Sequence, residues 1–296
     1  MPERKGRIHL FIGLPASGKS TIAKERLKKD GALMRVNRDD IRTMLFEKWK
    51  GKKEQVVTAV ETSAVKSALA LGYSIIIDDT NLNPKTRAGW QTLADQCGVL
   101  LVEEKFDTPL EECIRRDALR TGRARVGRPV IENMALCHGY LSRVDKKVVI
   151  FDVDGTLADH SNRLVYLQQK PKDYKSYYSA EAILDCKPIS SVVEWAQGTH
   201  FGGYYNIIVS GRPMDIAGNA TCQWLENNQV PYNHIFMRNG GDFRDDTLVK
   251  QEILDKLLKW VSKDQILFAV DDRPRIVRMW KENGITCYNV GDGHEF

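Results

Sequence analysis

The chain of 296 residues lacks a long hydrophobic run. A membrane-spanning helix needs about 20 predominantly apolar residues, and no stretch here approaches that length. The opening segment MPERKGRIHLFIG enters a strand-like run directly, without the apolar core and small-residue cleavage site of a signal peptide. Internal repeats and low-complexity tracts are also absent. We therefore expect a cytoplasmic protein with no membrane partner.

Cysteine and histidine are scarce and scattered, with six of each. No two cysteines have the short spacing of a zinc site, and no two histidines form a close pair with metal-ligand spacing. Because disulfides rarely persist in the cytoplasm, the cysteines are expected to be reduced and mostly buried thiols.

Charge is unevenly distributed within the net +5. Residues 1–147 contain 28 Lys and Arg against 19 Asp and Glu, a net charge of +9. Residues 148–296 contain 16 against 20, a net charge of −4. A positive first half suits a polyanionic substrate or phosphate groups, although a solvated basic surface would have the same composition.

Strand-like apolar runs alternate with helix-like stretches in both halves. The first half has expected strands at 8–12, 33–36, 74–77 and 100–106, and expected helices at 20–29, 55–71 and 84–97. The second half has expected strands at 147–153, 206–210, 234–237, 266–270 and 286–290. This alternation is typical of a parallel sheet with crossover helices. We expect two α/β domains, 1–145 and 146–296, with a small cap at about 157–187.

A phosphate-binding loop is indicated by Gly13-Leu-Pro-Ala-Ser-Gly-Lys19-Ser20, which matches G-x-x-x-x-G-K-[ST] between an expected strand and helix. Backbone amides of such a loop cradle a polyphosphate at a helix N-terminus. Lys19 would neutralise the β- and γ-phosphates, and the Ser20 hydroxyl would bind Mg²⁺. The alternative is a glycine-rich turn that binds nothing. The expected ATP-binding residues of the loop are Gly13, Pro15, Ala16, Ser17, Gly18, Lys19, Ser20 and Thr21.

Acidic residues follow two further strands of the first half. The strand at 33–36 ends in NRDDIR, where a carboxylate could accept the proton of an attacking hydroxyl and Arg42 could hold the acceptor's phosphate. Alternatively, Asp39 or Asp40 caps a helix. The strand at 74–77 ends in Asp78-Asp79-Thr80-Asn81, which could order Mg²⁺ and its waters or merely cap the next helix.

A basic segment follows, with Arg115, Arg116 and Arg120 on one expected helix. Arg116 and Arg120 are four residues apart, so they would share a helix face. Such a pair can close over a nucleotide and stabilise the transferring phosphoryl group. A solvated basic helix is the alternative.

The second half contains D-x-D-G-T at a strand end, beginning at Asp152. Residues two apart on a strand face the same way, so Asp152 can act as nucleophile and Mg²⁺ ligand while Asp154 acts as general acid and base. Further groups that suit a phosphoryl site end later strands or lie on a helix, although a double aspartate after a strand is often only a cap. They are Ser210, Gly211, Arg212, Lys250, Asp271 and Asp272.

Together these motifs resemble the bacteriophage polynucleotide 5'-kinase/3'-phosphatases almost from end to end. The likeness rests on GLPASGKST, NRDDIR and DDTNLNP in the first half and on IFDVDGTLA, VSGR and VDDRPRIVRMW in the second. It implies a P-loop kinase with a parallel sheet, followed by a Rossmann-like phosphatase of the haloacid dehalogenase type.

The resemblance also implies residue roles in the kinase. Asp39 is expected to be the general base, Arg42 to bind the acceptor's phosphate and Arg120 to act from a lid on the transferred phosphoryl group. Arg116 is expected to contact ATP, and Asp79 and Thr80 to contact the acceptor.

In the phosphatase, Asp152 is the expected nucleophile and Asp154 the acid and base. Asp246 resembles a further family position, and Arg163 is the expected substrate-binding arginine of the cap. Catalysis is assigned to Arg212 and Lys250, substrate binding to Ser210 and Gly211, and Mg²⁺ binding to Asp152, Asp154, Asp271 and Asp272.

The implied reactions are ATP-Mg²⁺-dependent phosphorylation of 5'-hydroxyl ends of RNA or DNA and removal of a 3'-phosphate or 2',3'-cyclic phosphate. The resulting 5'-phosphate and 3'-hydroxyl ends suit a ligase, which is the expected functional partner. The expected location is the cytoplasm, which is that of the host if the chain is phage-encoded. A homo-oligomer is also compatible with the sequence. Two other hypotheses are a small-molecule kinase fused to a metabolite phosphatase, and a nucleotide-sensing module without catalysis.

Overall fold

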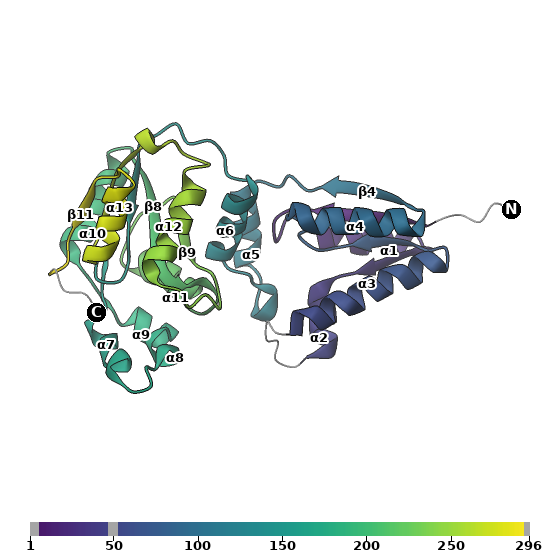
Figure 1. Cartoon of the computed structure of the whole chain (residues 1–296), viewed down its shortest axis with the longest axis horizontal. Coiled ribbons are helices and arrows are strands. Elements are labelled where there is room, and N and C mark those ends of the chain that lie inside the picture. The colour runs from purple at the N-terminus through teal and green to yellow at the C-terminus, as the bar shows by residue number, and fades with distance from the viewer. Residues whose placement is uncertain (1–5, 47–52, 293–296) are drawn as a thin grey trace. The chain divides into compact units, whose positions relative to one another are not determined.

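The computed structural model of the chain describes residues 6–46 and 53–292. The chain forms two compact units, Met1–Leu119 and Arg120–Phe296 (Figure 1). Each unit is built on a parallel β-sheet with helices between its strands. The α/β class expected from the alternating pattern is therefore confirmed. No helix in the described ranges is long and apolar enough to cross a membrane.

The first unit contains a four-stranded sheet in the order β2-β3-β1-β4. Its strands are β1 (Arg7–Ile12), β2 (Leu33–Val36), β3 (Ser74–Ile77) and β4 (Leu100–Lys105). Its helices are α1 (Lys19–Lys29), α2 (Arg38–Leu45), α3 (Glu54–Ala70), α4 (Pro84–Cys97) and α5 (Leu110–Ala118). Strand β3 is a nearly continuous apolar run, and Ile8, Leu10, Phe11 and Ile12 of β1 are buried, as is usual for parallel strands covered on both faces.

The sheet register brings three sequence motifs of the first unit to one edge. Ile8 pairs with Ile75 and Val36 with Ile77, so the carboxyl ends of β1, β2 and β3 lie side by side. The P-loop, the NRDDIR segment and the DDTN segment each begin at one of these ends. Ligands of open parallel sheets gather at this edge.

The second unit contains a five-stranded sheet in the order β11-β10-β5-β8-β9. Its strands are β5 (Val148–Phe151), β8 (Tyr205–Pro213), β9 (His234–Arg238), β10 (Ile266–Asp271) and β11 (Cys287–Asn289). Val149 and Phe151 of β5 enter one hydrophobic cluster, and Val148 and Ile150 enter another. Because successive residues of a strand face opposite sides, β5 anchors a core on each face of the sheet.

Helices complete the second unit. They are α6 (Arg128–His138), α10 (Ser190–Phe201), α11 (Met214–Asn227), α12 (Asp246–Leu257) and α13 (Pro274–Glu282), with short 3₁₀ turns at Gly122–Ala124 and Lys263–Gln265. The expected cap consists of α7 (Ser161–Gln168), α8 (Tyr174–Tyr177) and α9 (Ala180–Leu184) between the paired strands β6 (Ala158–Asp159) and β7 (Lys187–Pro188) (Figure 1).

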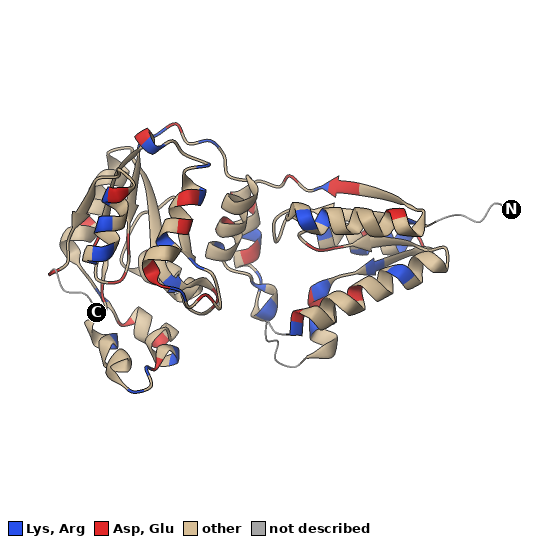
Figure 2. Cartoon of the chain, viewed as in Figure 1, with Lys and Arg blue, Asp and Glu red and all other residues tan. Residues whose placement is uncertain are grey.

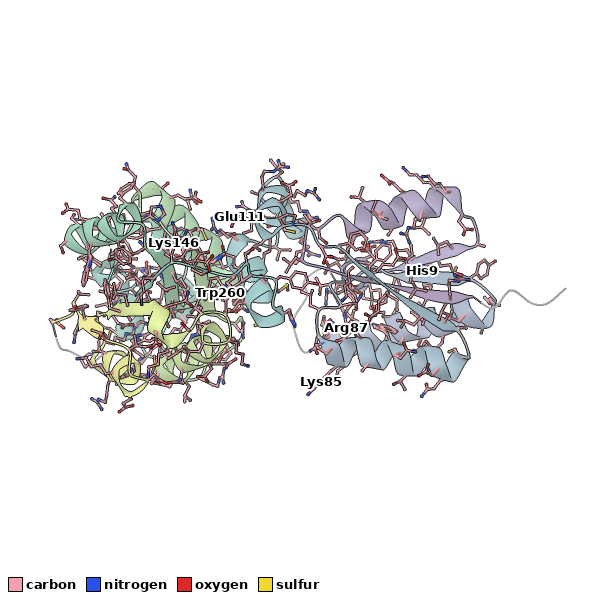
Figure 3. The ribbon with its side chains drawn as sticks, turned by 90° about the horizontal axis from the view of Figure 1, so that it is seen from above. His9, Lys85, Arg87, Glu111, Lys146 and Trp260 are labelled. Carbon is pink, nitrogen blue, oxygen red and sulfur yellow. The ribbon has the colours of Figure 1, made fainter. Side chains whose placement is uncertain are left out.

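Helix α6 packs on strand β9 and helix α11 in the second unit. The fully buried Glu132 of α6 accepts hydrogen bonds from the Ile235 amide at 2.7 Å and from Arg128 at 2.9 Å. The segment after α6 is also attached, because the Trp260 indole donates to the Ser142 carbonyl at 2.8 Å (Figure 3). Residues 120–145 thus lie in the compact second unit, and the boundary between functional domains at 145/146 stays a prediction.

Candidate active sites

The P-loop encloses its lysine at the N-terminus of α1. Lys19 is buried, and its ammonium donates to the carbonyls of Gly13 at 2.9 Å and Leu14 at 2.8 Å. The Thr108 hydroxyl, which sequence analysis did not single out, supports the loop by donating to the Ser17 carbonyl at 2.9 Å. The structure therefore presents the helix N-terminus and the lysine together, as phosphate binding requires.

Helix α2 is capped by Asn37, whose side chain accepts from the amides of Asp39 at 3.0 Å and Asp40 at 3.2 Å. Neither aspartate side chain is the N-cap, so that alternative for these aspartates is wrong. The Asp39 side chain is 83% exposed and ion-pairs with Arg42. It is thus available to an acceptor arriving from solvent.

Arg42 is also held by Glu54 of α3, a residue that sequence analysis missed. Arg38 joins the same carboxylate, with Nη2 of Arg38 2.6 Å from Oε1 of Glu54. Glu54 lies 12 residues after Arg42, and no local spacing rule links an N-terminal helix residue to an arginine of the preceding helix. An incoming phosphate would therefore compete with Glu54 and Asp39 for Arg42.

Asp78 and Asp79 both make contacts within the protein. Asp78 ion-pairs with Arg35 at 2.7 Å, and Asp79 accepts from the Arg38 amide at 3.0 Å. Burial and the neighbouring Asp79 raise the pKa of the buried Glu61 to about 9. Glu61 is therefore protonated at neutral pH and can donate to Asp79, whose remaining oxygen has no other donor within the described chain. Thr80 contributes its carbonyl, which accepts from the Gly13 amide at 3.0 Å.

The expectation that Arg115, Arg116 and Arg120 share one helix is wrong. Helix α5 ends at Ala118, and Arg120 lies beyond it. The following Thr121-Gly122 cannot extend the helix, because Gly122 has a left-handed backbone with φ of 58°. Arg116 stays on α5 with a guanidinium nitrogen 3.6 Å from where a Cβ on Gly18 would lie, close to the P-loop.

The second site is centred on Lys250 of α12. Its buried ammonium lies 2.8 Å from Asp152 Oδ1 and 2.7 Å from Asp271 Oδ2. Burial alone would lower the pKa of Lys250, but the two carboxylates outweigh it and raise that pKa. Burial raises the pKa of Asp152 well above its usual value; Lys250 opposes the shift, while Asp271 and Asp272 add to it.

Asp152, Asp271 and Asp272 form the group of acidic residues in the described chain that could hold a metal ion, with one oxygen of each within 4.8 Å of the others. All three are buried, and Oδ1 of Asp272 has no hydrogen-bond partner among residues 6–46 and 53–292. Burial and Asp271 raise the pKa of Asp272 to about 6. Three carboxylates beside one ammonium leave negative charge that a hard divalent cation such as Mg²⁺ would balance.

Gly155 lets this acidic group assemble. It has φ of +80°, and a Cβ placed on it would lie 2.1 Å from Oδ2 of Asp272. Any other residue would suffer backbone strain and push Asp272 away. The glycine of D-x-D-G-T is therefore required by close packing as well as by the turn.

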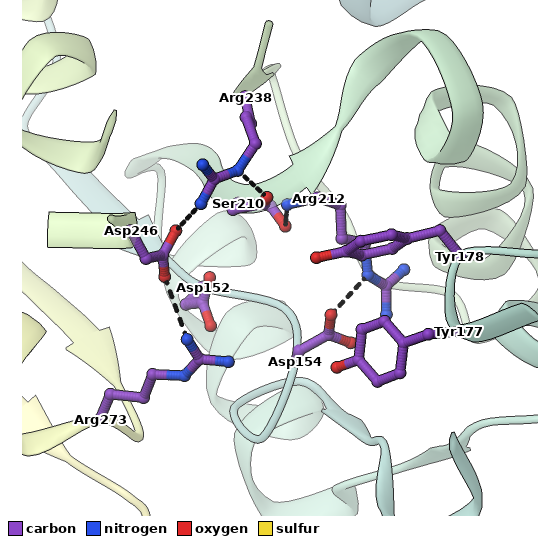
Figure 4. A pocket seen from close by; sticks show the side chains of 10 residues that line it. Asp152, Asp154, Tyr177, Tyr178, Ser210, Arg212, Arg238, Asp246 and Arg273 are labelled. Carbon is purple, nitrogen blue, oxygen red and sulfur yellow. Dashed lines mark hydrogen bonds and ion pairs between the residues drawn. The ribbon is translucent and has the colours of Figure 1, made fainter. Parts of the chain in front are cut away.

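Asp154 is directed to two arginines, and Figure 4 shows its contact with Arg212. Its carboxylate ion-pairs with the buried Arg163 of the cap and with the buried Arg212 of β8, whose Nε lies 3.0 Å from Oδ2. Burial alone would raise the pKa of Asp154, but Arg212 and Arg163 hold it well below its usual value. The structure thus brings Arg163 and Arg212 together on Asp154, whose carboxylate is not in the acidic group described above.

A small cavity of about 50 Å³ lies between these groups, with room for a few water-sized atoms such as the oxygens of one phosphoryl group. It is lined by Asp152, Asp154, Tyr177, Tyr178, Ser210, Gly211, Arg212, Arg238, Asp246 and Arg273 (Figure 4).

Four residues of this lining were missed by sequence analysis: Tyr177, Tyr178, Arg238 and Arg273. Arg238 donates to the Gly211 carbonyl at 2.7 Å and lies 3.1 Å from Asp246, which also pairs with Arg273 at 3.5 Å. The two arginines follow expected strands and could have been found by that position. The tyrosines belong to the cap, where no motif indicates which side chains face the sheet.

The fold and sites define a P-loop unit joined to an aspartate-based phosphatase unit of the haloacid dehalogenase type. Residues 8–137 match the AAA domain model, and residues 146–295 match the polynucleotide kinase PNKP phosphatase domain. The second match covers half of the chain, and the chain belongs to that family. These matches confirm the resemblance to polynucleotide kinase/phosphatases.

Two relatives are similar in sequence. A putative bifunctional polynucleotide kinase/RNA ligase of Autographa californica nuclear polyhedrosis virus is 27% identical over 317 residues, covering 98% of this chain and 43% of that protein. An L-seryl-tRNA(Sec) kinase of Methanococcus maripaludis is 29% identical over 131 residues, covering 42% of this chain and 49% of that protein. The chain thus spans less than half the length of these curated relatives. A chain in the structure of the Pnkp1/Rnl/Hen1 RNA repair complex is 25% identical, with 99% and 98% coverage and a TM-score of 0.42.

Proposed function

We propose that the chain heals nucleic-acid ends by phosphorylating 5'-hydroxyl groups with ATP and removing 3'-phosphates. The observation that supports this most directly is the pairing of Asp152 with Lys250 beside a phosphoryl-sized cavity, in a chain that also has a complete P-loop. The matches to polynucleotide kinase and phosphatase domains favour a polynucleotide as the substrate.

In the kinase reaction, Lys19 and the amides of the P-loop would hold the phosphates of ATP, with Ser20 and Mg²⁺ beside them. Arg116 lies near the loop and would contact ATP, and Arg120 would act from the lid. Asp39 would take the proton of the 5'-hydroxyl as its oxygen attacks the γ-phosphorus, and the bond from that phosphorus to the bridging oxygen would break to release ADP. Arg42 would give up its ion pairs with Asp39 and Glu54 and bind the acceptor's phosphate instead. The carboxylate of Asp39 would then be available to accept the proton.

In the phosphatase reaction, a carboxylate oxygen of Asp152 would attack the phosphorus of the 3'-phosphate. A bond from Asp152 to phosphorus forms, the bond from phosphorus to the 3'-oxygen breaks, and Asp154 supplies the proton to that oxygen. Water would then attack the phosphorus with Asp154 as base, which releases phosphate and restores Asp152. Mg²⁺ held by Asp152, Asp271 and Asp272 would neutralise phosphate charge that otherwise repels the nucleophile.

Asp154 needs a proton before it can act as an acid, whereas its arginine contacts favour the ionised form. A bound phosphate would compete with Asp154 for the hydrogen bonds of Arg212, which lines the cavity, and its negative charge would oppose the ionised form of Asp154. The pKa of Asp154 would then rise when substrate is present. Arg163 and Arg212 therefore have two proposed roles: binding the phosphoryl group and setting the protonation of Asp154.

A ligase would consume the resulting 3'-hydroxyl and 5'-phosphate ends. The viral relative's name combines a polynucleotide kinase with an RNA ligase, which favours functional coupling of this kind. Processing of 2',3'-cyclic phosphate, use of DNA, homo-oligomer formation and a cytoplasmic location stay predictions.

The test is an assay on a single-stranded oligonucleotide with a 5'-hydroxyl and a 3'-phosphate, with both ends analysed. We expect γ-phosphate from labelled ATP at the 5' end and release of inorganic phosphate from the 3' end. Nucleosides and sugar phosphates serve as competing substrates. Efficient reaction with these small molecules and none with the oligonucleotide would contradict the proposal. Beryllofluoride, a mimic of a phosphoryl group on aspartate, should inhibit only the 3'-end reaction.

A further inference from the structure

A second hollow lies on the phosphatase unit, beside the catalytic pocket. It has a volume of about 500 Å³, ten times that of the pocket, and is open to solvent. It is lined by Pro274, Val277, Arg278, Lys281, Glu282 and Asn289, which belong to α13 and β11. None of these residues has a role in the reactions proposed above.

The linings of the hollow and of the catalytic pocket meet along the chain. Arg273 lines the pocket, and the next residue, Pro274, lines the hollow. On the neighbouring strand, Asn289 pairs in register with Asp271, which contacts Lys250. From Pro274 to Lys281 the helix rises about 10 Å. A substrate strand that leaves the pocket past Arg273 can therefore continue along α13 without crossing the sheet.

The charges of the hollow favour an anion. Arg278 and Lys281 are exposed and three residues apart on α13, so they share a face. Among the described residues neither has a carboxylate partner, in contrast to Arg275 of the same helix, which pairs with Asp245 at 3.2 Å. Figure 2 shows blue Lys and Arg positions on α13. Glu282 is the one acidic residue of the lining and lies at the end of α13 away from the pocket.

The floor of the hollow is apolar. Pro274 is half-buried and Val277 is buried, and both lie between the pocket and the basic pair. A partner that combines negative charges with flat or apolar groups fits such a surface. Single-stranded nucleic acid has this chemistry, because its phosphates repeat along a backbone that also carries sugars and bases.

We propose that the α13 surface, defined by Pro274, Val277, Arg278, Lys281 and Asn289, binds the sugar–phosphate backbone of the strand whose 3'-phosphate enters the catalytic pocket. This inference rests on the proposed phosphatase function and extends it, because it explains how a polymer is preferred over a mononucleotide. Arg278 and Lys281 would contact internal phosphates, and the apolar floor would contact a sugar or base.

The test compares the double variant Arg278→Gln/Lys281→Gln with the control Lys259→Gln/Lys263→Gln. The control removes the same charge from exposed lysines before β10, at the amino ends of the parallel strands, whereas the catalytic pocket lies at their carboxyl ends. For each protein, kcat/KM is measured on a 3'-phosphorylated oligonucleotide and on a 3'-nucleoside monophosphate. We expect the preference for the oligonucleotide to fall about tenfold in the α13 variant and to stay at the original value in the control.

Salt dependence gives a second readout. Each contact to a phosphate of a single strand contributes about −0.7 to the slope of log K against log salt. Loss of two contacts should therefore reduce that slope by about 1.4 in magnitude. An unchanged substrate preference together with an unchanged slope would overturn the proposal.

Failure of the proposed function is distinguishable from failure of this surface. If the unaltered chain hydrolyses neither substrate, the phosphatase proposal fails. Binding of the same oligonucleotide, measured by fluorescence anisotropy in an Asp152→Asn background, still decides the role of α13. Equal affinities of the α13 variant and the control would overturn the proposed role of α13. An affinity at least about threefold weaker in the α13 variant would support that role.

Discussion

The two sites differ in how far the folded protein buries their charged side chains. In the first unit the expected base Asp39 is 83% exposed, and its partner Arg42 is shared with Glu54. In the second unit the expected nucleophile Asp152 is 7% exposed, and the ammonium beside it is 1% exposed. The kinase site is therefore assembled at a surface, whereas the phosphatase site is enclosed in the unit's interior.

This difference agrees with what each group would do in its proposed role. A carboxylate that attacks a phosphate gains from a dry site in which fixed charges act strongly. Burial of four charged side chains is tolerable there because Lys250 lies between Asp152 and Asp271. A base that accepts a proton from the end of a polymer must instead be reachable. We therefore expect substitution of the exposed Asp39 to change rates alone, and substitutions in the second site to change stability as well.

The largest effect should be separation of the two activities. Asp152→Asn should lower 3'-phosphate release by about 10⁴-fold or more because the nucleophile is lost, while 5'-phosphorylation continues. Lys19→Ala should do the reverse, since its ammonium contacts the P-loop carbonyls of Gly13 and Leu14. End-labelling and phosphate release measured on one oligonucleotide check both. If Asp152→Asn abolished kinase activity in a folded protein, the comparison of two independent sites would be wrong.

Asp39→Asn should lower the kinase turnover by roughly 10²–10⁴-fold, the usual contribution of a general base. ATP affinity and thermal unfolding should change little, because the side chain is exposed and does not cap α2. Asp40→Asn is the matched control, since Asp40 is its neighbour and pairs with Arg35 instead. Equal kinase rates in the two variants would contradict the assignment of Asp39 as base.

Lys250→Met should destabilise the second unit by roughly 3–5 kcal/mol, because it leaves buried carboxylates without their ammonium. Added Mg²⁺ should restore part of this stability by supplying positive charge to Asp152, Asp271 and Asp272. Urea unfolding with and without Mg²⁺ measures both effects. Lys256→Met, on the same helix and paired with the more exposed Glu252, should cost less than about 1 kcal/mol.

The smallest effect concerns Glu61 in the first unit. Its pKa of about 9 in the folded chain exceeds the ordinary value of 4.5, so the folded state retains a proton that the unfolded state releases. Stability should therefore fall as pH rises between these values, by up to about 1.4 kcal/mol per pH unit. Glu61→Gln keeps a donor toward Asp79 and should flatten this slope.

Urea unfolding followed from pH 6 to pH 9 checks this prediction. Glu25→Gln, which changes a glutamate on the exposed side of α1, is the control and should keep the original slope. If Glu61→Gln and the unaltered chain showed the same slope, Glu61 would not hold the proton.

Much of the fold could be predicted because its signals are local. The expected helix at 84–97 coincides with α4, which begins at Pro84 after the cap Asn83 and ends before Gly98 in a left-handed conformation. The strands at 33–36 and 74–77 are likewise observed with those bounds. Arg120 shows the limit, since the helix expected to include it ends two residues earlier.

The sequence by itself determined the order of strands and helices, the P-loop and the D-x-D-G-T turn, because periodicity, capping and turn residues act over a few neighbouring positions. Only the tertiary structure decided which charges meet. Lys250 reaches Asp152 and Asp271 across the sheet, Arg42 shares Glu54 with Arg38, and Tyr177 of the cap faces the catalytic pocket. These contacts join residues far apart in the chain, and their geometry and pKa shifts depend on burial and distance, which no short segment encodes.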